Sequence, residues 1–502
     1  MGENLKRVKE RWAEISDLGS VQELLGWDQH TYMPPGGSAA RAEQIATLQR
    51  LEHQMLTSTE TRKWLDGAER EVESLDPDSD DRAFVTVARR DLEDALKLPE
   101  ELVVERARTS SLALEAWADA RENNLFVRFA PWLQKVIELE RRVAEHRGYE
   151  DHPYDALLDL YERGARTRQV TAFFAELRER LVPLARRIIE AAGEPDSLLN
   201  QLYPIPAQET ASRRLAEKIG YDFRSGRIDP TAHPFATAMS RTDVRITTRY
   251  NAQEPAQALF AALHETGHAL YEQGMPEDFE RTPLRGGASL GVHESQSRLW
   301  ENLVGRSRGF WEAQLPGLRE IFPDQLRDAS VDRFYRAVNR VDRSFIRVEA
   351  DEVTYNLHVL VRFKIETEMI DGRLNAADAP EVWNDRMQTH LGITPPDDRL
   401  GILQDVHWSM GAIGYFPTYT IGTLLSCQLW EAALRTRPAI PEEIRQGDTS
   451  TLLNWLRENI HRHGRKYLPD DLIQRATGAP LSAAPFLRYL EAKYSELYGL
   501  AN

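Results

Sequence analysis

The chain has 502 residues, of which 63 are Lys or Arg and 79 are Asp or Glu, and its formal net charge at pH 7 is −16. An acidic chain without a basic stripe has no electrostatic means of holding a polyanion, which argues against nucleic acid and anionic membrane surfaces as partners. With 41% hydrophobic and 28% charged residues, the composition is that of an ordinary globular protein. The function must therefore depend on a local site.

The start of the chain and its single cysteine bear on the compartment. The first residues, MGENLKRVKERWAEI, carry charges where a signal peptide has an apolar core. No stretch approaches the roughly 18 uninterrupted apolar residues of a membrane helix. The lone Cys427 cannot form an internal disulfide, and its apolar neighbours indicate a small buried thiol. We therefore expect a cytoplasmic protein without a membrane segment.

Most of the chain shows the hydrophobic period of α-helices, interrupted by Pro, Gly and Asp clusters. Residues Arg343 to Met369, for example, read as one long amphipathic helix. Strand signals are scarce. The clearest lies at Asp243 to Tyr250, where Val244, Ile246 and Thr248 alternate with polar residues. We therefore expect a mainly α protein with one small sheet.

A helix is predicted directly after that strand. Asn251 or Glu254 can cap its start, Pro255 is tolerated in its first turn, and Gly274 ends it before a proline. The sheet and this helix are therefore neighbours along the chain.

This helix contains the segment His264-Glu265-Thr266-Gly267-His268. Histidines four residues apart share one helix face, so both imidazoles can reach one metal ion. The glutamate between them can take a proton from a water molecule beside that ion. The alternative is a solvated helix face or a pair of hydrogen-bonded core histidines.

A catalytic zinc site needs a third protein ligand and one open position. After Gly286-Gly287 a second helix is predicted, and Glu294 in it follows His268 by 26 residues. That distance allows the chain to turn and lay the second helix against the first. On spacing alone, His293 and Glu301 are alternatives to Glu294.

These residues belong to a series of short motifs that runs along the chain. The series resembles the M32 family of metallocarboxypeptidases, the thermostable carboxypeptidase Taq type. The motifs are Trp27 to Gly37 (WDQHTYMPPGG), His233-Pro234-Phe235, Asp243-x-Arg245-x-Thr247, His264-Glu265-x-x-His268, His293-Glu294-Ser295-Gln296-Ser297, Ile346-Arg347-x-x-Ala350-Asp351 and Gly401-x-x-Gln404-Asp405-x-His407-Trp408.

The resemblance implies a fold like that of neurolysin and angiotensin-converting enzyme. Residues 1–502 would form a single catalytic domain with two helical lobes around a deep cleft, and the small sheet would lie beside the zinc helix. It implies that His264, His268 and Glu294 hold zinc, or cobalt as in some members. It also implies removal of C-terminal residues from peptides one at a time, with broad specificity, by an enzyme that is usually a homodimer.

The same resemblance assigns the chemistry to residues. Glu265 would act as general base on the water and then as acid to the leaving amine. The oxyanion of the tetrahedral intermediate needs hydrogen-bond donors, for which His407 and Tyr415 are the candidates, with Tyr419 as the alternative to Tyr415. Without the motif, His407 reads as a core histidine beside Trp408.

An exopeptidase must also bind the terminal carboxylate, and a guanidinium offers two parallel hydrogen bonds for it. Arg347 is the first candidate and Arg245 the second. The alternative for Arg347 is a surface ion pair with Asp351, four residues further on the same predicted helix. The strand that carries Arg245 could offer an exposed edge to the peptide backbone. His233 either faces the cleft or belongs to a proline-fixed turn.

Two other hypotheses remain open at this stage. One is an endo-oligopeptidase on the same fold, and the other is a non-catalytic scaffold that binds peptides. A binding protein could keep both histidines and the metal but would not need Glu265, so the presence of this glutamate favours catalysis.

Overall fold

The computed structural model describes residues 2–193 and 196–500, and these residues are mainly α-helical. Three short strands form the sheet in this part of the chain. The predicted mainly α fold with a small sheet is therefore confirmed. None of the helices in the described ranges combines the length and the apolarity needed to cross a bilayer.

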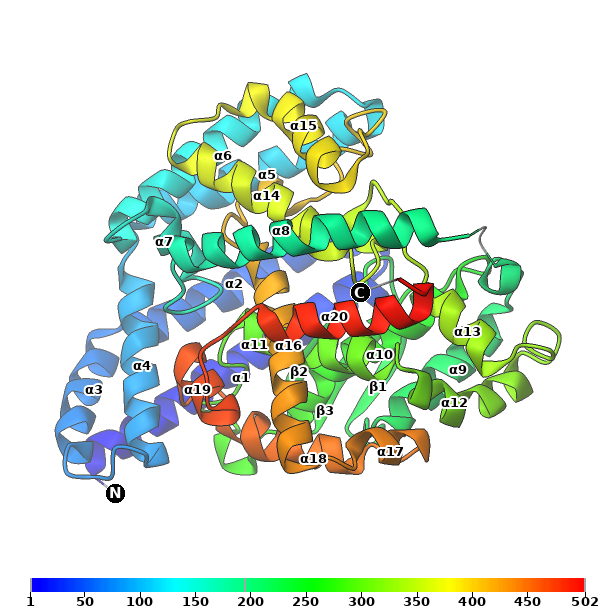
Figure 1. The fold of residues 1–502 in the computed structure, drawn as a ribbon. Coiled ribbons are helices and arrows are strands. Elements are labelled where there is room, and N and C mark those ends of the chain that lie inside the picture. Colours follow the sequence, from blue (N-terminus) through cyan, green and yellow to red (C-terminus); the bar gives the residue numbers. More distant parts are fainter. Residues whose placement is uncertain (1, 194–195, 501–502) are drawn as a thin grey trace. The chain divides into compact units, whose positions relative to one another are not determined.

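The described residues form two compact units, each built from three separate stretches of the chain. Unit 1 comprises residues 2–96, 196–338 and 429–480, and unit 2 comprises residues 97–193, 339–428 and 481–500. The helix α16 (Pro417–Thr436) contributes to both units. The elements of each unit can be followed in Figure 1 by label and colour.

Unit 1 contains the sheet, the first four helices and a group of later helices. Its helices are α1 (Glu3–Thr31), α2 (Ser38–Thr57), α3 (Thr59–Val72), α4 (Asp80–Leu96), α9 (Ile205–Lys218), α10 (Pro255–Gln273), α11 (Leu290–Arg298), α12 (Arg308–Ile321), α13 (Val331–Val338), α17 (Ile440–Arg445), α18 (Ser450–Asn459) and α19 (Pro469–Thr477). One apolar cluster joins the first helices, with Leu5, Val8 and Trp12 of α1 against Leu65 of α3 and Phe84 of α4. Side chains of this size each stabilise the fold by roughly 1.5–3 kcal/mol when fully buried.

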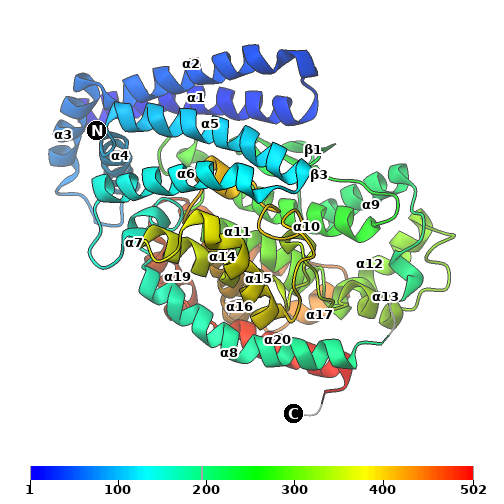
Figure 2. The same cartoon turned by 90° about the horizontal axis from the view of Figure 1, so that it is seen from above.

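Unit 2 is helical throughout its described residues. Its helices are α5 (Glu100–Asn123), α6 (Phe126–Arg147), α7 (Pro153–Leu158), α8 (Thr167–Ala191), α14 (Tyr355–Ile370), α15 (Ala379–Leu391) and α20 (Ala484–Tyr498). Figure 2 shows α5 and α6 side by side. Helix α14 packs against α6, α8 and α15, and nearly all its residues are buried. The buried Cys427 agrees with the thiol expected from sequence.

The sheet consists of β1 (Gly226–Pro230), β2 (Ala236–Ser240) and β3 (Asp243–Thr248), in the order β1-β3-β2. Strand β3 pairs in parallel with β1 and antiparallel with β2. The predicted strand is therefore present, but it is the central strand and has no free edge. The expectation that its own edge could pair with a peptide is wrong, because both sides of β3 already hydrogen-bond to neighbouring strands.

Helix α10 has the boundaries that its sequence signals predict. Glu254 is the N-cap residue, although its side chain makes no capping hydrogen bond, and Pro255 occupies the first turn. Gly274 ends the helix, with its backbone N–H bonded to carbonyls of the last turn. The helix packs on the sheet through a cluster that includes Ala269, Val244 and Ile246.

The second predicted helix begins at Leu290 as α11, where the Ser289 side chain caps it by accepting from the Val292 N–H. From Leu299 to Val304 the helix continues as a π-helical turn. Such turns insert one extra residue per turn and change the direction of the side chains that follow. This change determines where Glu301 points.

The long helix predicted from Arg343 to Met369 is wrong in its first half. Residues 343–354 are irregular apart from a 3-10 turn, η5 (Arg347–Glu349), and α14 begins only at Tyr355. The reason is Asp351, whose carboxylate accepts the backbone N–H groups of Val353 and Thr354. An Asp side chain that bonds to the backbone in this way favours a helix start over a helix interior.

Candidate metal centre

Two neighbouring helices bring together the three side chains that the sequence nominates as metal ligands. The Oε2 atom of Glu294 on α11 lies 3.5 Å from Nε2 of His264 and 3.4 Å from Nε2 of His268, both on α10. The three donor atoms all lie within 4.8 Å of one another. Ligands at about 2.1 Å from a tetrahedral zinc lie roughly 3.4 Å apart, so this donor set fits one such ion.

Behind the two histidines lies a second layer of hydrogen bonds. Nδ1 of His264 is 2.8 Å from Glu301 Oε2, and Nδ1 of His268 is 2.7 Å from Nδ1 of His293. Nε2 of His293 is in turn 3.0 Å from Glu272 Oε1. His293 and Glu301, which spacing alone left as alternative ligands, therefore contact the far side of the histidine rings. Such partners fix the ring orientation and the tautomer of a metal ligand.

Glu294 is held in place by its own helix. Arg298 Nε donates to Oε1 at 2.7 Å and the Ser297 hydroxyl donates to Oε2 at 3.0 Å. Burial opposes the charge on Glu294, but Arg298 and His264 outweigh burial and hold its pKa well below the ordinary value. At neutral pH the side chain is therefore a carboxylate, the form that binds metal ions.

Glu265 lies on the same helix between the two histidines and is only 6% exposed. Its carboxylate makes no hydrogen bond to the residues that the structure describes. Burial raises the pKa of Glu265 to about 7. A carboxyl group without a protein partner is free to exchange a proton with a water molecule.

The close approach of α10 and α11 depends on Gly267 within the histidine motif. A Cβ atom at this position would lie 2.6 Å from the Gln296 carbonyl oxygen and 2.6 Å from Ser297 Cα. Gln296 itself accepts a hydrogen bond from the buried His461 at 3.0 Å. The absence of a side chain at Gly267 thus allows the helix with Glu294 to lie directly against the helix with the histidines.

Residues from three of the sequence motifs contact one another on the sheet face that points away from α10. Arg245 on β3 forms two hydrogen bonds with Asp243, at 2.8 and 2.9 Å, and its guanidinium lies 4.2 Å from the centre of the Trp27 ring. Thr247 bonds to the backbone N–H of Phe235, whose ring contacts His30. These side chains alternate with the residues that face α10.

Arg245 therefore lies on the sheet face that α1 covers, not on the face that packs against α10. His233 is exposed on the segment between β1 and β2. The structure does not gather either residue with the histidine and glutamate group. Figure 1 shows the sheet together with α1 and α10 in unit 1.

Unit 2 holds the remaining candidates, and Arg347 is buried there with 4% exposure. Its Nε and Nη2 atoms donate to Asp405 Oδ1 at 3.2 and 2.8 Å, and Nη1 donates to the Tyr355 hydroxyl at 2.8 Å. The suggested surface ion pair with Asp351 is wrong, because Arg347 is buried in the 3-10 turn before α14 and its partner Asp405 lies 58 residues further along the chain.

Asp405 is shared between two arginines. Arg362, which is fully buried, donates through Nε to Asp405 Oδ2 at 2.6 Å. Burial opposes ionisation of Asp405, but Arg347 and Arg362 hold its pKa well below the ordinary value. The cluster thus contains two guanidinium groups and one carboxylate. No local pattern signals the pairing of Asp405 with Arg347 and Arg362, although Asp405 stands in the same motif as His407.

His407 begins a 3-10 turn, η7 (His407–Met410), and packs among aromatic rings. Its ring centre is 4.5 Å from that of Phe416 and 5.2 Å from that of Tyr415, and its Nε2 is 3.3 Å from the Tyr419 hydroxyl. Burial lowers the pKa of His407 to about 4, so the imidazole is neutral at pH 7. Tyr419 also contacts Arg347, whose guanidinium lies 4.8 Å from its ring centre.

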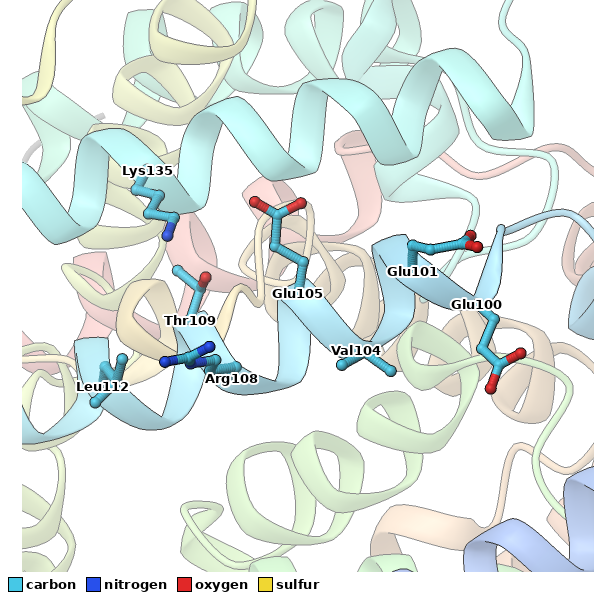
Figure 3. Close-up of a pocket in the computed structure, with 8 residues that line it drawn as sticks. All are labelled: Glu100, Glu101, Val104, Glu105, Arg108, Thr109, Leu112 and Lys135. Carbon is cyan, nitrogen blue, oxygen red and sulfur yellow. The ribbon is translucent and has the colours of Figure 1, made fainter.

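A separate groove of about 700 Å³ lies on unit 2 along α5, with one wall from α6. Figure 3 shows its lining side chains, which carry both signs of charge: Glu100, Glu101, Val104, Glu105, Arg108, Thr109, Leu112 and Lys135. None of the candidate site residues lines this groove.

Comparison with known proteins gives a consistent result over the whole chain. Residues 7–494 match the family model described as carboxypeptidase Taq (M32) metallopeptidase. The chain is 44% identical to thermostable carboxypeptidase 1 of Thermus thermophilus, in a match that covers 99% of each chain. It is 39% identical to carboxypeptidase 1 of Bacillus subtilis, in a match that covers 96% of each chain. The crystal structure of the M32 carboxypeptidase of Deinococcus radiodurans R1 superposes with a TM-score of 0.97 at 44% identity, covering 99% of this chain and 100% of that one.

Proposed function

Since the chain belongs to the carboxypeptidase Taq (M32) metallopeptidase family, and is thus a peptide hydrolase, we propose that it is a zinc-dependent carboxypeptidase that releases C-terminal residues one at a time with broad specificity. The observation that carries the proposal is the group of His264, His268 and Glu294 around one point, with Glu265 beside it. Two imidazoles and one carboxylate are a common ligand set of catalytic zinc, although cobalt also suits these donors.

A divalent cation in this site would polarise the peptide carbonyl and make water a stronger nucleophile at neutral pH. Glu265 then accepts the proton from that water and passes it to the leaving amine. The buried position of Glu265 and its lack of a hydrogen-bond partner support this role. The second layer of His293, Glu272 and Glu301 keeps the ligand rings in position.

We assign the stabilisation of the oxyanion to His407 and Tyr415. The centre of the Tyr415 ring lies 5.2 Å from that of the His407 ring, and Tyr419, whose hydroxyl is within hydrogen-bond distance of His407, stays the alternative to Tyr415. The neutral imidazole of His407 can donate a hydrogen bond from its protonated nitrogen. Donors held rigidly at the site of developing charge contribute typically about 3–4 kcal/mol to transition-state stabilisation.

We assign recognition of the terminal carboxylate to Arg347. The buried cluster of Arg347, Arg362 and Asp405 has a formal charge of 2 − 1 = +1, and the nearby His407 and His358 are neutral because burial lowers the pKa of each. A substrate carboxylate would neutralise this buried charge. Of the five N–H groups of Arg347, three donate to Asp405 and Tyr355, which leaves two for a further acceptor.

Arg245 and His233 are weaker candidates for substrate binding. Arg245 is paired with Asp243 and stacked on Trp27, and His233 is an exposed side chain of the segment before β2. The proposal further includes a homodimer that acts in the cytoplasm and a single catalytic domain over residues 1–502 with two lobes around its cleft. The alternatives are an endo-oligopeptidase and a non-catalytic peptide-binding scaffold.

Replacement of Glu265 tests the proposal against the scaffold alternative. The variant Glu265→Gln should bind zinc with the affinity of the unmodified protein but lose roughly 10²–10⁴ or more in kcat. The matched control is Glu254→Gln, the same substitution at the exposed start of the same helix, which should retain full activity. Full activity of Glu265→Gln would refute the assignment of the general base.

A further inference from the structure

Glu366 on α14 is a carboxyl group in the interior of unit 2 that the proposed chemistry does not use. Its side chain is fully buried. Burial raises the pKa of Glu366 to about 7, which reflects the cost of placing a charge there. In the part of the chain that the structure describes, no Lys, Arg or His forms an ion pair with it. A buried carboxyl group without an ion-pair partner calls for an explanation in its hydrogen bonds.

Three donors surround the Glu366 carboxylate. The indole Nε1 of Trp408 donates to Oε1 at 2.7 Å, while the Tyr154 hydroxyl and the Gly414 backbone N–H donate to Oε2 at 2.6 and 3.2 Å. The lone pairs of the two carboxyl oxygens suffice to accept all three bonds. Two of the donors belong to one short segment, and the third comes from α7.

The two donors of that segment stand next to the two residues assigned to the oxyanion. Trp408 directly follows His407, and Gly414 directly precedes Tyr415. Glu366 therefore holds both ends of the loop that separates these side chains. Because each bond is made one residue away from a candidate donor, loss of a bond would move His407 or Tyr415 without removing it.

The rest of the loop has little freedom of its own. Gly414 has a φ angle of +92°, and a Cβ atom there would lie 2.8 Å from the Leu157 backbone of α7. The Trp408 ring packs edge-on against Trp383, with centres 6.0 Å apart. The loop is thus pressed against its neighbours at the points where Glu366 holds it.

We propose that Glu366 is a positioning residue that fixes His407 and Tyr415 through its bonds to Trp408 and Gly414. This inference rests on the proposed roles of His407 and Tyr415 in the reaction. Glu366 does not touch substrate in this account. Its effect is to keep the two donors in the geometry that the transition state needs, where small displacements cost catalysis more than binding.

The test compares two bonds made by the same carboxylate. Trp408→Phe removes the donor next to His407, whereas Tyr154→Phe removes a donor that is not in the loop and serves as the matched control. We expect Trp408→Phe to lower kcat about tenfold with KM changed less than about twofold, and Tyr154→Phe to leave kcat within about twofold. Zinc content and the thermal midpoint, measured for each variant, correct for any loss of folded protein.

A double variant distinguishes positioning from general destabilisation. If Trp408 acts through His407, then adding Trp408→Phe to His407→Ala should cost less than about twofold in kcat, because its target is already absent. The same tenfold loss in both backgrounds, or equal losses in Trp408→Phe and Tyr154→Phe, would overturn the inference. Glu366→Gln keeps the shape of the side chain and should repeat the loss seen in Trp408→Phe.

The controls also separate this inference from the proposed function. If His407→Ala and Tyr415→Phe are as active as the unmodified protein, the assignment of the oxyanion donors fails, and the inference about Glu366 fails with it. If both lose activity but Trp408→Phe and Glu366→Gln do not, the oxyanion assignment stands and only the positioning role of Glu366 is refuted.

Discussion

The contact between α10 and α11 gives a prediction in which one methyl group should disturb the metal centre. Gly267 lies between the two histidines of α10, and its Cα faces the backbone of α11. In the variant Gly267→Ala, the new Cβ would lie 2.6 Å from both the Gln296 carbonyl oxygen and Ser297 Cα. Ordinary van der Waals contact begins at 3.4 Å, so one helix must move by about 3.4 − 2.6 = 0.8 Å.

The size of the effect follows from what the methyl group meets. Both close atoms are backbone atoms, so no side chain can rotate away, and overpacking of this kind costs typically about 1–3 kcal/mol. A Gly to Ala change in a helix interior otherwise gains roughly 0.5–1 kcal/mol. The difference between the midpoints of these two ranges is a net loss of about 1 kcal/mol. Glu294 is on the displaced helix, so zinc affinity should fall about tenfold, equivalent to about 1.4 kcal/mol.

Calorimetric titration with zinc and thermal unfolding of the metal-free protein measure the two effects separately. Gly19→Ala is the control, because Gly19 lies within α1 and a Cβ there meets nothing within 4 Å. This control should be slightly more stable than the unmodified protein and bind zinc equally well. If Gly267→Ala matched Gly19→Ala in both measurements, the close approach of the two helices would not be what positions Glu294.

Three further predictions follow from the second layer, the arginine cluster and the buried glutamate. His293→Leu should weaken zinc binding about 10–100-fold in calorimetric titration while leaving the three ligands in place, and unchanged affinity would contradict its supporting role. Arg347→Lys should raise KM for peptides about tenfold or more with zinc affinity unchanged, since a lysine lacks the planar pair of donors, and an unaltered KM would exclude Arg347 from carboxylate binding. Between pH 4.5 and about 7 folded Glu366 keeps a proton that the unfolded chain has lost, so the free energy of unfolding should fall as pH rises. In denaturant titrations Glu366→Gln should flatten this slope, and an identical slope would show that another group titrates.

Local signals predicted α10 well, the helix that carries His264 and His268. Pro255 and Gly274 fixed its ends, and the four-residue spacing of His264 and His268 fixed the shared face. These features depend only on the local sequence and on helix geometry. They can therefore be predicted without the tertiary structure. The choice among Glu294, His293 and Glu301 did not follow from spacing.

The π-helical turn explains why that choice needed a structure. Helical spacing assigns side-chain directions only while the helix stays regular, and the turn from Leu299 to Val304 changes the direction of Glu301 towards Nδ1 of His264. His293 in turn bonds to Glu272, which is 21 residues earlier in the chain. Neither contact has a short-range signal.

Two errors in the sequence predictions have different physical origins. The periodicity of residues 343–369 suggests one helix because apolar residues are frequent on every side of the buried α14. The same pattern places Asp351 inside the helix, whereas its carboxylate caps the helix start. Strand β3 was expected to have an exposed edge because alternation reports which face is buried and not which strands lie beside it. A local capping bond decided the first case and the tertiary pairing of strands decided the second.

The direction of attack on a peptide is the most direct test of the proposed function. One peptide should be supplied with a free C-terminus and with an amidated C-terminus, each with and without a chelator, and the products followed by mass spectrometry. Stepwise loss of C-terminal residues from the free peptide alone, abolished by the chelator and restored by zinc, is the expected result. Equal internal cleavage of both peptides, or cleavage that persists without metal, would contradict the account.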